Sequence, residues 1–487
     1  MTNIRLSQIA AGVLAFSAVS SFGAIRAVTP TAWNGDPNCW QMKRHHEKMA
    51  VVTNGGAKVV FIGDSITHFW GGAGKAQLAK YFSEGDLKML NLGTSADRTE
   101  HVLWRLTAGK ELDGYEAKVV FLMIGTNNSG HFKFYEEPPI DTILGIREIL
   151  NVIRGKQPKA KVVLTSIFPR GADGTDSYRL RNDVVNREIR KFADGVDILW
   201  LDMDGVFAAP DGTLSRSVFP DLLHPSAVGY EMWYAAVRPY LEFVFSGSKV
   251  PFGFTDLKPR STAGGAKAQA VDPVSRIRGE GYGAFDWWLD RALGNRNQIV
   301  GSKGKIDLVF LGDSITHNWE VQGREMLAEL RKTYSVLNIG YSGDRTQHLL
   351  WRGENGELDG YTAKCAMLMI GTNNGGDDAE QVAAGIKEIL ALIARKQPKA
   401  KTLLLPIFPR GTKPDDKLRV KNDKVNEIIR GYADGEKVIW VDFNAKFLDK
   451  DGNTKWIMPD ALHPNAEAYR TIWMPAVLPY FKEIVGK

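Results

Sequence analysis

Serine, aspartate and histidine occur in the first half of this chain in a pattern that could support nucleophilic catalysis. Ser65 lies in the tripeptide Gly-Asp-Ser directly after an apolar run, and Asp221 and His224 lie three residues apart near the end of that half. A serine hydroxyl is a poor nucleophile unless a base accepts its proton. An imidazole held in place by a carboxylate can be that base, so the pattern predicts acyl transfer through Ser65.

The second half repeats this pattern with Ser314, Asp460 and His463. A single Asp-x-x-His is more typical of a helix N-cap followed by a surface histidine. Its recurrence at the matching place in both halves favours a catalytic pair in each half. The Gly-x-Ser-x-Gly motif of α/β-hydrolases is absent from the chain, which argues against that fold.

Acyl transfer also needs hydrogen-bond donors for the oxyanion that forms on the substrate. Asn127 and Asn373 follow apolar runs and carry side-chain amides. Gly93 and Gly340 follow the preceding apolar run in each half, and a glycine lets a backbone N–H approach a ligand closely. The alternative for all four residues is a turn that only ends a strand.

Four motifs recur in the same order in the two halves, which indicates a duplicated domain rather than a solenoid. The recurring segments are 63–68 and 312–317, 123–128 and 369–374, 167–171 and 407–411, and 221–225 and 460–464. We therefore predict one domain over residues 36–245 and a second over 284–487. Residues 246–283 are rich in Gly, Ser, Ala, Lys and Pro and are expected to form a linker.

Apolar runs alternate with amphipathic stretches inside each copy. In the first copy the predicted strands are 59–62, 118–124, 161–167 and 197–201, and the predicted helices include 140–154 and 180–192. Continuous apolar runs are typical of strands buried on both faces, and alternation with helices predicts a parallel sheet between two helical layers. Ligands bind beyond the carboxyl ends of such strands, where the serine and asparagine motifs are expected to lie.

Taken together, Ser, Gly, Asn and His in this order, with Gly-Asp-Ser first and Asp-x-x-His last, resemble the SGNH (GDSL-type) hydrolases. The resemblance covers nearly all of both copies. Segments 343–352 and 354–358 are similar to the catalytic subunits of intracellular platelet-activating-factor acetylhydrolase and their bacterial relatives. The family implies two tandem flavodoxin-like three-layer α/β/α domains with central parallel sheets, and no metal or cofactor.

The resemblance also implies a role for each candidate residue. The nucleophiles are Ser65 and Ser314, the general bases His224 and His463, their orienting carboxylates Asp221 and Asp460, and the oxyanion donors, besides each serine N–H, Gly93, Asn127, Gly340 and Asn373. One departure is Ala96, because the second copy has Gly343 at that position. The alanine is expected to restrict this loop in the first copy.

The N-terminus is typical of a secretory signal peptide over residues 1–24. Arg5 precedes an uncharged apolar stretch over residues 9–22, and small residues allow cleavage after Gly23 or Ala24. The apolar stretch is too short to span a bilayer comfortably. We therefore expect a secreted or periplasmic protein without stable membrane insertion.

The net charge of +6 over 487 residues comes from Lys and Arg interleaved with acidic residues, which argues against a nucleic-acid partner. Cys39 and Cys365 lie in no metal-binding spacing, and a disulfide between them is not favoured. The tryptophans that match between the copies, Trp70 with Trp319 and Trp104 with Trp351, favour a core or groove wall over sugar stacking.

We expect a serine esterase that removes short acyl groups, with acetate favoured, from O-esters on carbohydrate. A lipid esterase or lysophospholipase is one alternative, and a degenerate copy that binds carbohydrate is another. The substrate is thus a small-molecule or polysaccharide ester, and the oligomeric state stays open. Activity should resist chelators and rise through about pH 6–7 as a histidine base loses its proton. A longer loop after Asn128, with Phe132, Phe134 and Tyr135, should give the first copy its own specificity.

Overall fold

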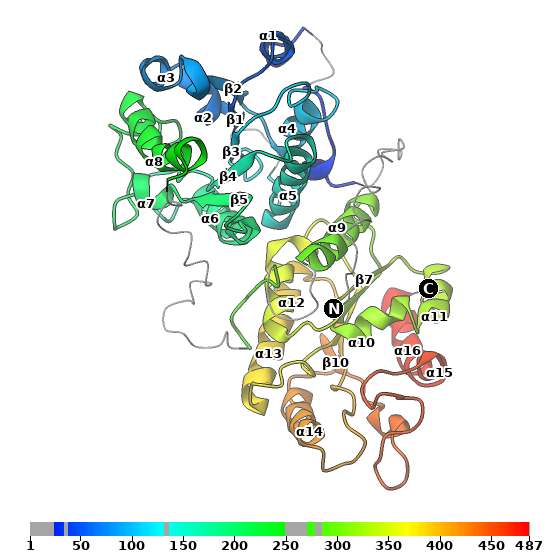
Figure 1. Cartoon of the computed structure of the whole chain (residues 1–487). Coiled ribbons are helices and arrows are strands. Elements are labelled where there is room, and N and C mark those ends of the chain that lie inside the picture. The colour runs from blue at the N-terminus through cyan, green and yellow to red at the C-terminus, as the bar shows by residue number, and fades with distance from the viewer. Residues whose placement is uncertain (1–23, 34–37, 131–135, 249–269, 278–284, 487) are drawn as a thin grey trace, which may run out of the picture.

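The computed structural model describes residues 24–33, 38–130, 136–248, 270–277 and 285–486 (Figure 1). Residues 1–23 of the expected signal peptide, and the aromatic residues expected after Asn128, lie outside the described residues.

Each copy contains one five-stranded parallel sheet, which confirms the predicted fold (Figure 1). In the first copy the strand order is β2-β1-β3-β4-β5, and in the second it is β10-β9-β8-β6-β7. The strands of the first copy are β1 (Val59–Gly63), β2 (Met89–Gly93), β3 (Val119–Met123), β4 (Lys161–Thr165) and β5 (Ile198–Leu201). Those of the second are β6 (Leu308–Gly312), β7 (Val336–Gly340), β8 (Cys365–Met369), β9 (Lys401–Leu404) and β10 (Val438–Trp440).

Helices follow the strands and cover both faces of each sheet. The first copy has α1 (Trp40–Thr53), α2 (Ser65–His68), α3 (Lys75–Tyr81), α4 (Thr99–Leu106), α5 (Pro139–Lys156), α6 (Ser177–Ile189), α7 (Asp204–Phe207) and α8 (Ala227–Ser246). The second has α9 (Phe285–Gly301), α10 (Ser314–His317), α11 (Arg324–Arg331), α12 (Thr346–Arg352), α13 (Ala379–Lys396), α14 (Lys417–Arg430), α15 (Ala466–Ala468) and α16 (Met474–Val485).

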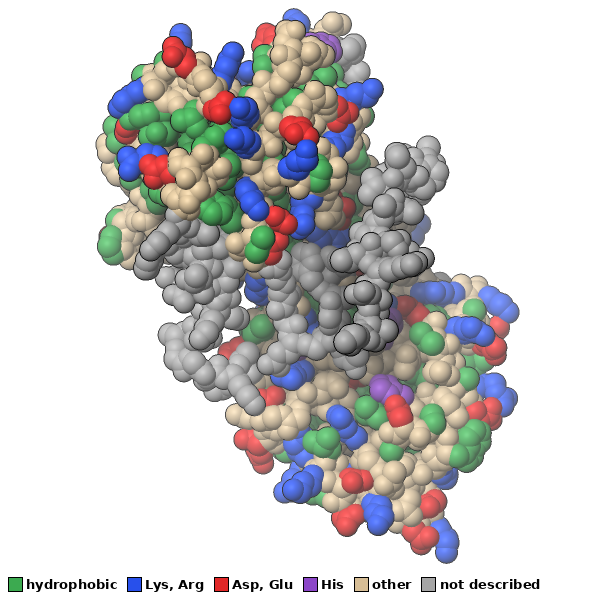
Figure 2. Space-filling view, viewed as in Figure 1, with side chains coloured by type: hydrophobic (Ala, Val, Ile, Leu, Met, Phe, Trp, Pro, Cys, Tyr) green, Lys and Arg blue, Asp and Glu red, His purple; other side chains and the backbone are tan. Residues whose placement is uncertain are grey.

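The central strands are buried along their whole length, as their apolar runs predict. Every residue of β1, β3, β6 and β8 is buried. Trp70 and Trp319 are also fully buried, so they belong to the core and not to a substrate groove. On the face shown in Figure 2, Lys and Arg side chains are interspersed with Asp and Glu over both copies. Within the described ranges, no helix is long and apolar enough to cross a membrane.

A short segment before each copy lies across that copy's own helices. The carbonyl of Ala27 approaches Gly145 of α5, and the carbonyl of Ala270 approaches Gly385 of α13 in the same way. Thr346 Oγ1 donates a hydrogen bond to Ala270 O at 2.7 Å. Residues 270–277, which lie within the expected linker, thus pack against the second copy.

Candidate active site

In the first copy, Ser65 and His224 meet at the carboxyl edge of the sheet. Ser65 begins α2 directly after β1, and its Oγ lies 2.9 Å from His224 Nε2. On the other side of the ring, His224 Nδ1 lies 2.7 Å from Asp221 Oδ2. Asp221 Oδ1 also accepts the backbone N–H groups of Leu223 and His224, at 3.0 and 2.7 Å. The carboxylate therefore fixes both the loop and the imidazole.

The second copy has the same arrangement. Ser314 Oγ lies 2.8 Å from His463 Nε2, and His463 Nδ1 lies 2.6 Å from Asp460 Oδ2. Asp460 Oδ1 accepts the backbone N–H of His463 at 2.7 Å. The six serine, histidine and aspartate residues singled out in the sequence thus form two separate hydrogen-bonded chains.

Both aspartates stay ionised in this setting. Partial burial favours the neutral acid, but hydrogen bonds from the partner histidine's side chain and from backbone N–H groups prevail, so the pKa of Asp221 and of Asp460 lies below 3.8. An ionised carboxylate accepts the Nδ1 proton of the histidine, which leaves Nε2 free to face the serine.

The Phe-Pro-Arg-Gly motif supports the loop that carries the aspartate and histidine. Gly171 N donates to Leu222 O at 2.9 Å, and Gly411 N donates to Ala461 O at 2.8 Å. Leu222 and Ala461 have positive φ angles of 61° and 55°, which turns the chain between each aspartate and its histidine. The third repeated motif therefore has a positioning role that its sequence alone did not indicate.

The two asparagines lie at the same edge of their sheets. Asn127 Nδ2 donates to Asp97 O at 2.8 Å, and Asn373 Nδ2 donates to Asp344 O at 3.0 Å. Each amide uses one of its two N–H groups in this hydrogen bond, which orients the amide. The second N–H bond of each amide can serve a ligand.

The backbone N–H groups of Gly93 and Gly340, which were expected to serve as oxyanion donors, are already hydrogen-bonded in this geometry. Gly93 N donates to Asn91 Oδ1 at 2.9 Å, and Gly340 N donates to Asn338 Oδ1 at 3.0 Å. A Cβ atom on Gly93 would lie 2.3 Å from His68 N. The glycine is therefore required because α2 packs directly on the end of β2, and Gly340 occupies the same position beside α10.

The turn after Gly93 offers a different backbone donor. Ala96 and Gly343 have positive φ angles of 67° and 78° and directly precede Asp97 and Asp344, whose carbonyls bind the asparagine amides. Ala96 is partly exposed and directly precedes Asp97, whose carbonyl accepts the hydrogen bond from Asn127. The difference between the copies that the sequence shows, Ala96 against Gly343, thus lies in this turn.

Sequence reasoning did not single out a histidine and a serine next to each site. His68 Nδ1 lies 2.8 Å from Ser95 Oγ, and His317 Nδ1 lies 2.9 Å from Ser342 Oγ. Burial, followed by nearby cations, lowers the pKa of His68 and of His317 to about 4, so both rings are neutral at neutral pH. The available signal was their recurrence in the repeated motifs.

An aromatic surface adjoins the first site. Trp40, which is 47% exposed, stacks on His68 with ring centroids 5.9 Å apart. His68 contacts Phe69, whose ring centroid lies 5.2 Å from that of His224. The second copy keeps Trp287 beside His317 at 5.8 Å, but Asn318 replaces Phe69.

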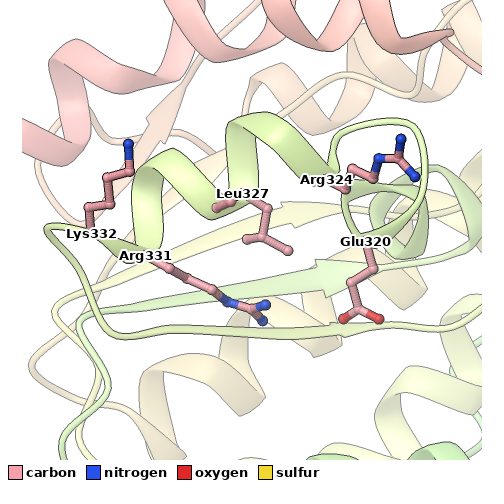
Figure 3. Close-up of a pocket in the computed structure, with 6 residues that line it drawn as sticks. Glu320, Arg324, Leu327, Arg331 and Lys332 are labelled. Carbon is pink, nitrogen blue, oxygen red and sulfur yellow. The ribbon is translucent and has the colours of Figure 1, made fainter.

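A surface hollow of about 380 Å³ lies elsewhere, over α11 of the second copy (Figure 3). Glu320, Arg324, Leu327, Arg331 and Lys332 line it, and none of the site residues above contributes. We therefore place the site by the hydrogen-bonded side chains and not by this hollow. Among the described residues, no group of three or more His, Cys, Asp or Glu could hold a metal ion.

This chain is similar to several known proteins. A family model described as GDSL-like lipase/acylhydrolase matches residues 61–232 and 310–471. Platelet-activating factor acetylhydrolase IB subunit alpha1 of Pongo abelii is 36% identical over 211 residues, covering 42% of this chain and 85% of that protein. Subunit alpha2 of Gallus gallus is 39% identical over 190 residues, covering 38% of this chain and 82% of that protein.

A solved structure of a catalytic mutant of an acetylxylan esterase from Geobacillus stearothermophilus is also similar. It is 19% identical, with a TM-score of 0.30, and the match covers 38% of this chain and 94% of that one.

Proposed function

We propose that this chain, which belongs to the GDSL-like lipase/acylhydrolase family and is a carboxylic ester hydrolase, removes short acyl groups from O-esters at two serine sites. The observation that carries the proposal is the hydrogen-bonded chain from Ser65 through His224 to Asp221, which recurs in the second copy.

The first step forms an acyl-enzyme. His224 Nε2 accepts the proton of Ser65 as Oγ bonds to the acyl carbon, and the carbonyl oxygen becomes an oxyanion. The same proton then passes to the leaving alcohol as the C–O bond to that alcohol breaks. In the second step a water molecule loses a proton to His224 and attacks the acyl carbon. The bond from that carbon to Ser65 Oγ then breaks, His224 returns the proton to Oγ, and the acid is released. Ser314 and His463 act in the same way.

The oxyanion is stabilised by donors at the carboxyl edge of each sheet. In the first copy we assign the N–H of Ser65, the second N–H of the Asn127 amide, and the N–H of Ala96 in the turn that holds that amide. In the second copy Ser314, Asn373 and Gly343 take these roles. Fixed donors aimed at developing charge are among the largest contributions to acyl transfer.

The acyl group is short, and acetate is the favoured one. This assignment rests on the relatives named above, which are acetylhydrolases by name, at 36% and 39% identity. The leaving alcohol is carbohydrate in our proposal, because the exposed Trp40 ring stacked on His68 offers a flat apolar surface near His224. Export to the periplasm or the exterior, where acetylated glycans are accessible, completes the proposal.

The test compares four proteins: the unaltered chain, Ser65→Ala, Ser314→Ala and the double variant. p-Nitrophenyl esters of increasing acyl length give the acyl preference, and acetate release from acetylated glycans and acetylated lipids gives the alcohol. Each single variant should keep part of the activity and the double variant almost none. Full activity of the double variant would exclude both serines as nucleophiles, and preference for long acyl chains would favour a lipid esterase.

A further inference from the structure

The two copies contact each other through surfaces that do not correspond. Helix α5 of the first copy lies against α9 of the second and against the turn Gly353–Glu357 (Figure 1). If the contact were symmetric, α13 would lie against α1 in the same manner. Among the described elements, that pairing is not one of the main contacts. The first copy thus contacts the second through α5, the helix that follows its Asn127 loop.

The centre of this contact is a buried ion pair. Arg296 of α9 donates to both carboxylate oxygens of Asp141 in α5, from Nε at 2.8 Å and from Nη2 at 3.0 Å. Each residue is only 4% exposed. Arg296 Nη1 also donates to Gly356 O at 2.6 Å. Two-point arginine–carboxylate pairs hold both partners in one geometry, and a buried pair is strongly destabilised when one partner is lost.

The turn at Gly356 packs against the beginning of α5. A Cβ atom at Gly356, where φ is 133°, would lie 2.8 Å from both Pro138 and Ile140 of the first copy. The matching turn of the first copy is one residue longer. Lys110, which precedes Glu111 as Gly356 precedes Glu357 and also has a positive φ of 59°, is exposed. The glycine is therefore suited to a surface that another domain covers, and the lysine to one that solvent covers.

From α5 the contact continues to the oxyanion side of the first site. Glu137, which immediately precedes the N-cap Pro138, accepts a hydrogen bond from Asn128 Nδ2 at 2.7 Å and pairs with Arg98 at 2.6 Å. Glu137 N donates to Asn128 O at 2.9 Å. Asn128 adjoins Asn127. Two hydrogen bonds between Glu137 and Asn128 thus join the start of α5 to the Asn127 loop, and the ion pair joins Glu137 to the turn before α4.

In the second copy, the start of the equivalent helix α13 is held by residues of that same copy. Asp378 caps α13 by accepting from Gln381 N at 2.7 Å, and Gln381 Oε1 accepts from Asp378 N at 3.0 Å. In the first copy the N-cap is Pro138, which makes no side-chain cap bond. Gln381 stands at the position of Asp141. Gln381 thus completes the helix cap in the second copy, whereas Asp141 at the same position of the first copy pairs with Arg296 of the second copy.

We propose that Asp141 and Arg296 are positioning residues through which the second copy holds the oxyanion loop of the first. The first site then depends on the second domain, whereas the second site is self-sufficient. This inference rests on the proposed function for its kinetic consequence but not for its structural one.

The test uses Arg296→Met, because Met49 stands at this position in the first copy. In a Ser314→Ala background, which leaves only the first site, kcat should fall about ten- to hundredfold, since small misplacements of catalytic groups have effects of this size. KM for p-nitrophenyl acetate should stay within about threefold. In a Ser65→Ala background, kcat of the second site should stay within about twofold. Arg296→Lys, which keeps the charge, should restore part of the loss.

The matched control is Asp290→Asn, which removes the ion pair between Arg147 and Asp290 at the rim of the same contact. Asp290 is 62% exposed in its side chain, so this change should alter neither site. Gly356→Lys, which introduces the first copy's residue, should reproduce the effect of Arg296→Met. Equal losses at both sites, or no loss at the first site, would overturn the proposal.

Hydrogen exchange of the full chain gives a readout that needs no turnover. Arg296→Met should accelerate exchange at residues 126–130 and leave residues 372–376 unchanged. If the first site hydrolyses no ester but this difference appears, the proposed function fails at that site and the positioning role stands. Unchanged exchange at residues 126–130 would overturn the positioning role.

Discussion

The ring of Phe69 packs against the ring of His224, with centroids 5.2 Å apart and planes tilted by 50°. His224 returns its proton to the leaving alcohol in the proposed mechanism, so that alcohol must lie next to this histidine. Phe69 is half-buried and therefore offers part of its ring to the alcohol. Asn318 offers an amide at the corresponding position of the second copy.

We predict that Phe69 gives the first site a preference for alcohols with a flat apolar face. In a Ser314→Ala background, Phe69→Asn should lower the kcat/KM ratio of phenyl acetate to methyl acetate by roughly two- to tenfold, because aromatic contacts contribute about 0.5–1.5 kcal/mol. Asn318→Phe in a Ser65→Ala background should raise the same ratio. Acyl-length preference should not change in either variant. Unchanged alcohol ratios in both variants would contradict the assignment.

The sequence predicted the two sheets and the two serine–histidine–aspartate chains well, for a physical reason. Buried parallel strands need continuous apolar runs, and catalytic groups at their ends must recur when a domain is duplicated. The sequence could not decide the role of Gly93, because a glycine that lets a ligand approach and a glycine that lets a helix approach look alike in sequence. Only the approach of His68 N, at 2.3 Å from a would-be Cβ, separates the two cases.

The contact between the copies could not be predicted from the sequence. Asp141 and Arg296 are 155 residues apart, and neither belongs to a repeated motif. A buried ion pair leaves no local pattern, because its partners are chosen by the way two surfaces meet. The backbone hydrogen bond from Gly171 N to Leu222 O, which explains the positioning role of the Phe-Pro-Arg-Gly motif, leaves no sequence pattern either.

Ala96 provides a prediction about stability. An alanine with φ of 67° is strained by roughly 1–2 kcal/mol, whereas glycine adopts this conformation freely but loses more backbone entropy on folding. Ala96→Gly should therefore raise the free energy of unfolding by about 0.5–1 kcal/mol in urea titrations. Gly343→Ala should lower it by a similar amount, since only the flexible end of Arg276 approaches the new Cβ, at 3.2 Å. A lower free energy of unfolding for Ala96→Gly, or a higher one for Gly343→Ala, would contradict the strain argument.

Asp64 and Asp313 provide a prediction about pH. Complete burial raises the pKa of both carboxyls from 3.8 to about 7, and Asp64 Oδ2 makes no hydrogen bond with the described residues. Because the folded pKa is the higher one, the stability gained from the neutral acid is fully present below about pH 4. It is lost as pH rises through about 7.

Replacing both residues by asparagine should remove this dependence, because an amide stays neutral and still accepts the N–H of Ile66, which Asp64 Oδ1 accepts at 3.0 Å. Each pKa unit corresponds to about 1.4 kcal/mol, so the unaltered chain should lose a few kcal/mol between pH 4 and 8 relative to the double variant. Thermal unfolding at several pH values measures the difference. Parallel curves for the two proteins would show that these carboxyls do not take up protons on folding.

The last prediction separates the two candidate roles at the end of β2. In a Ser314→Ala background, Asn127→Ala should lower kcat about 10²–10³-fold with little change in KM, the usual effect of losing one oxyanion donor. Asn91→Ala releases the Gly93 N–H, which now donates to Asn91 Oδ1 at 2.9 Å. If that N–H served the oxyanion, its release would raise kcat. We expect no increase, and a loss of about 1 kcal/mol in the free energy of unfolding, because the variant loses the hydrogen bond between Asn91 and Gly93 at the end of β2. An increase in kcat for Asn91→Ala would restore Gly93 as the donor and remove Ala96 from that role.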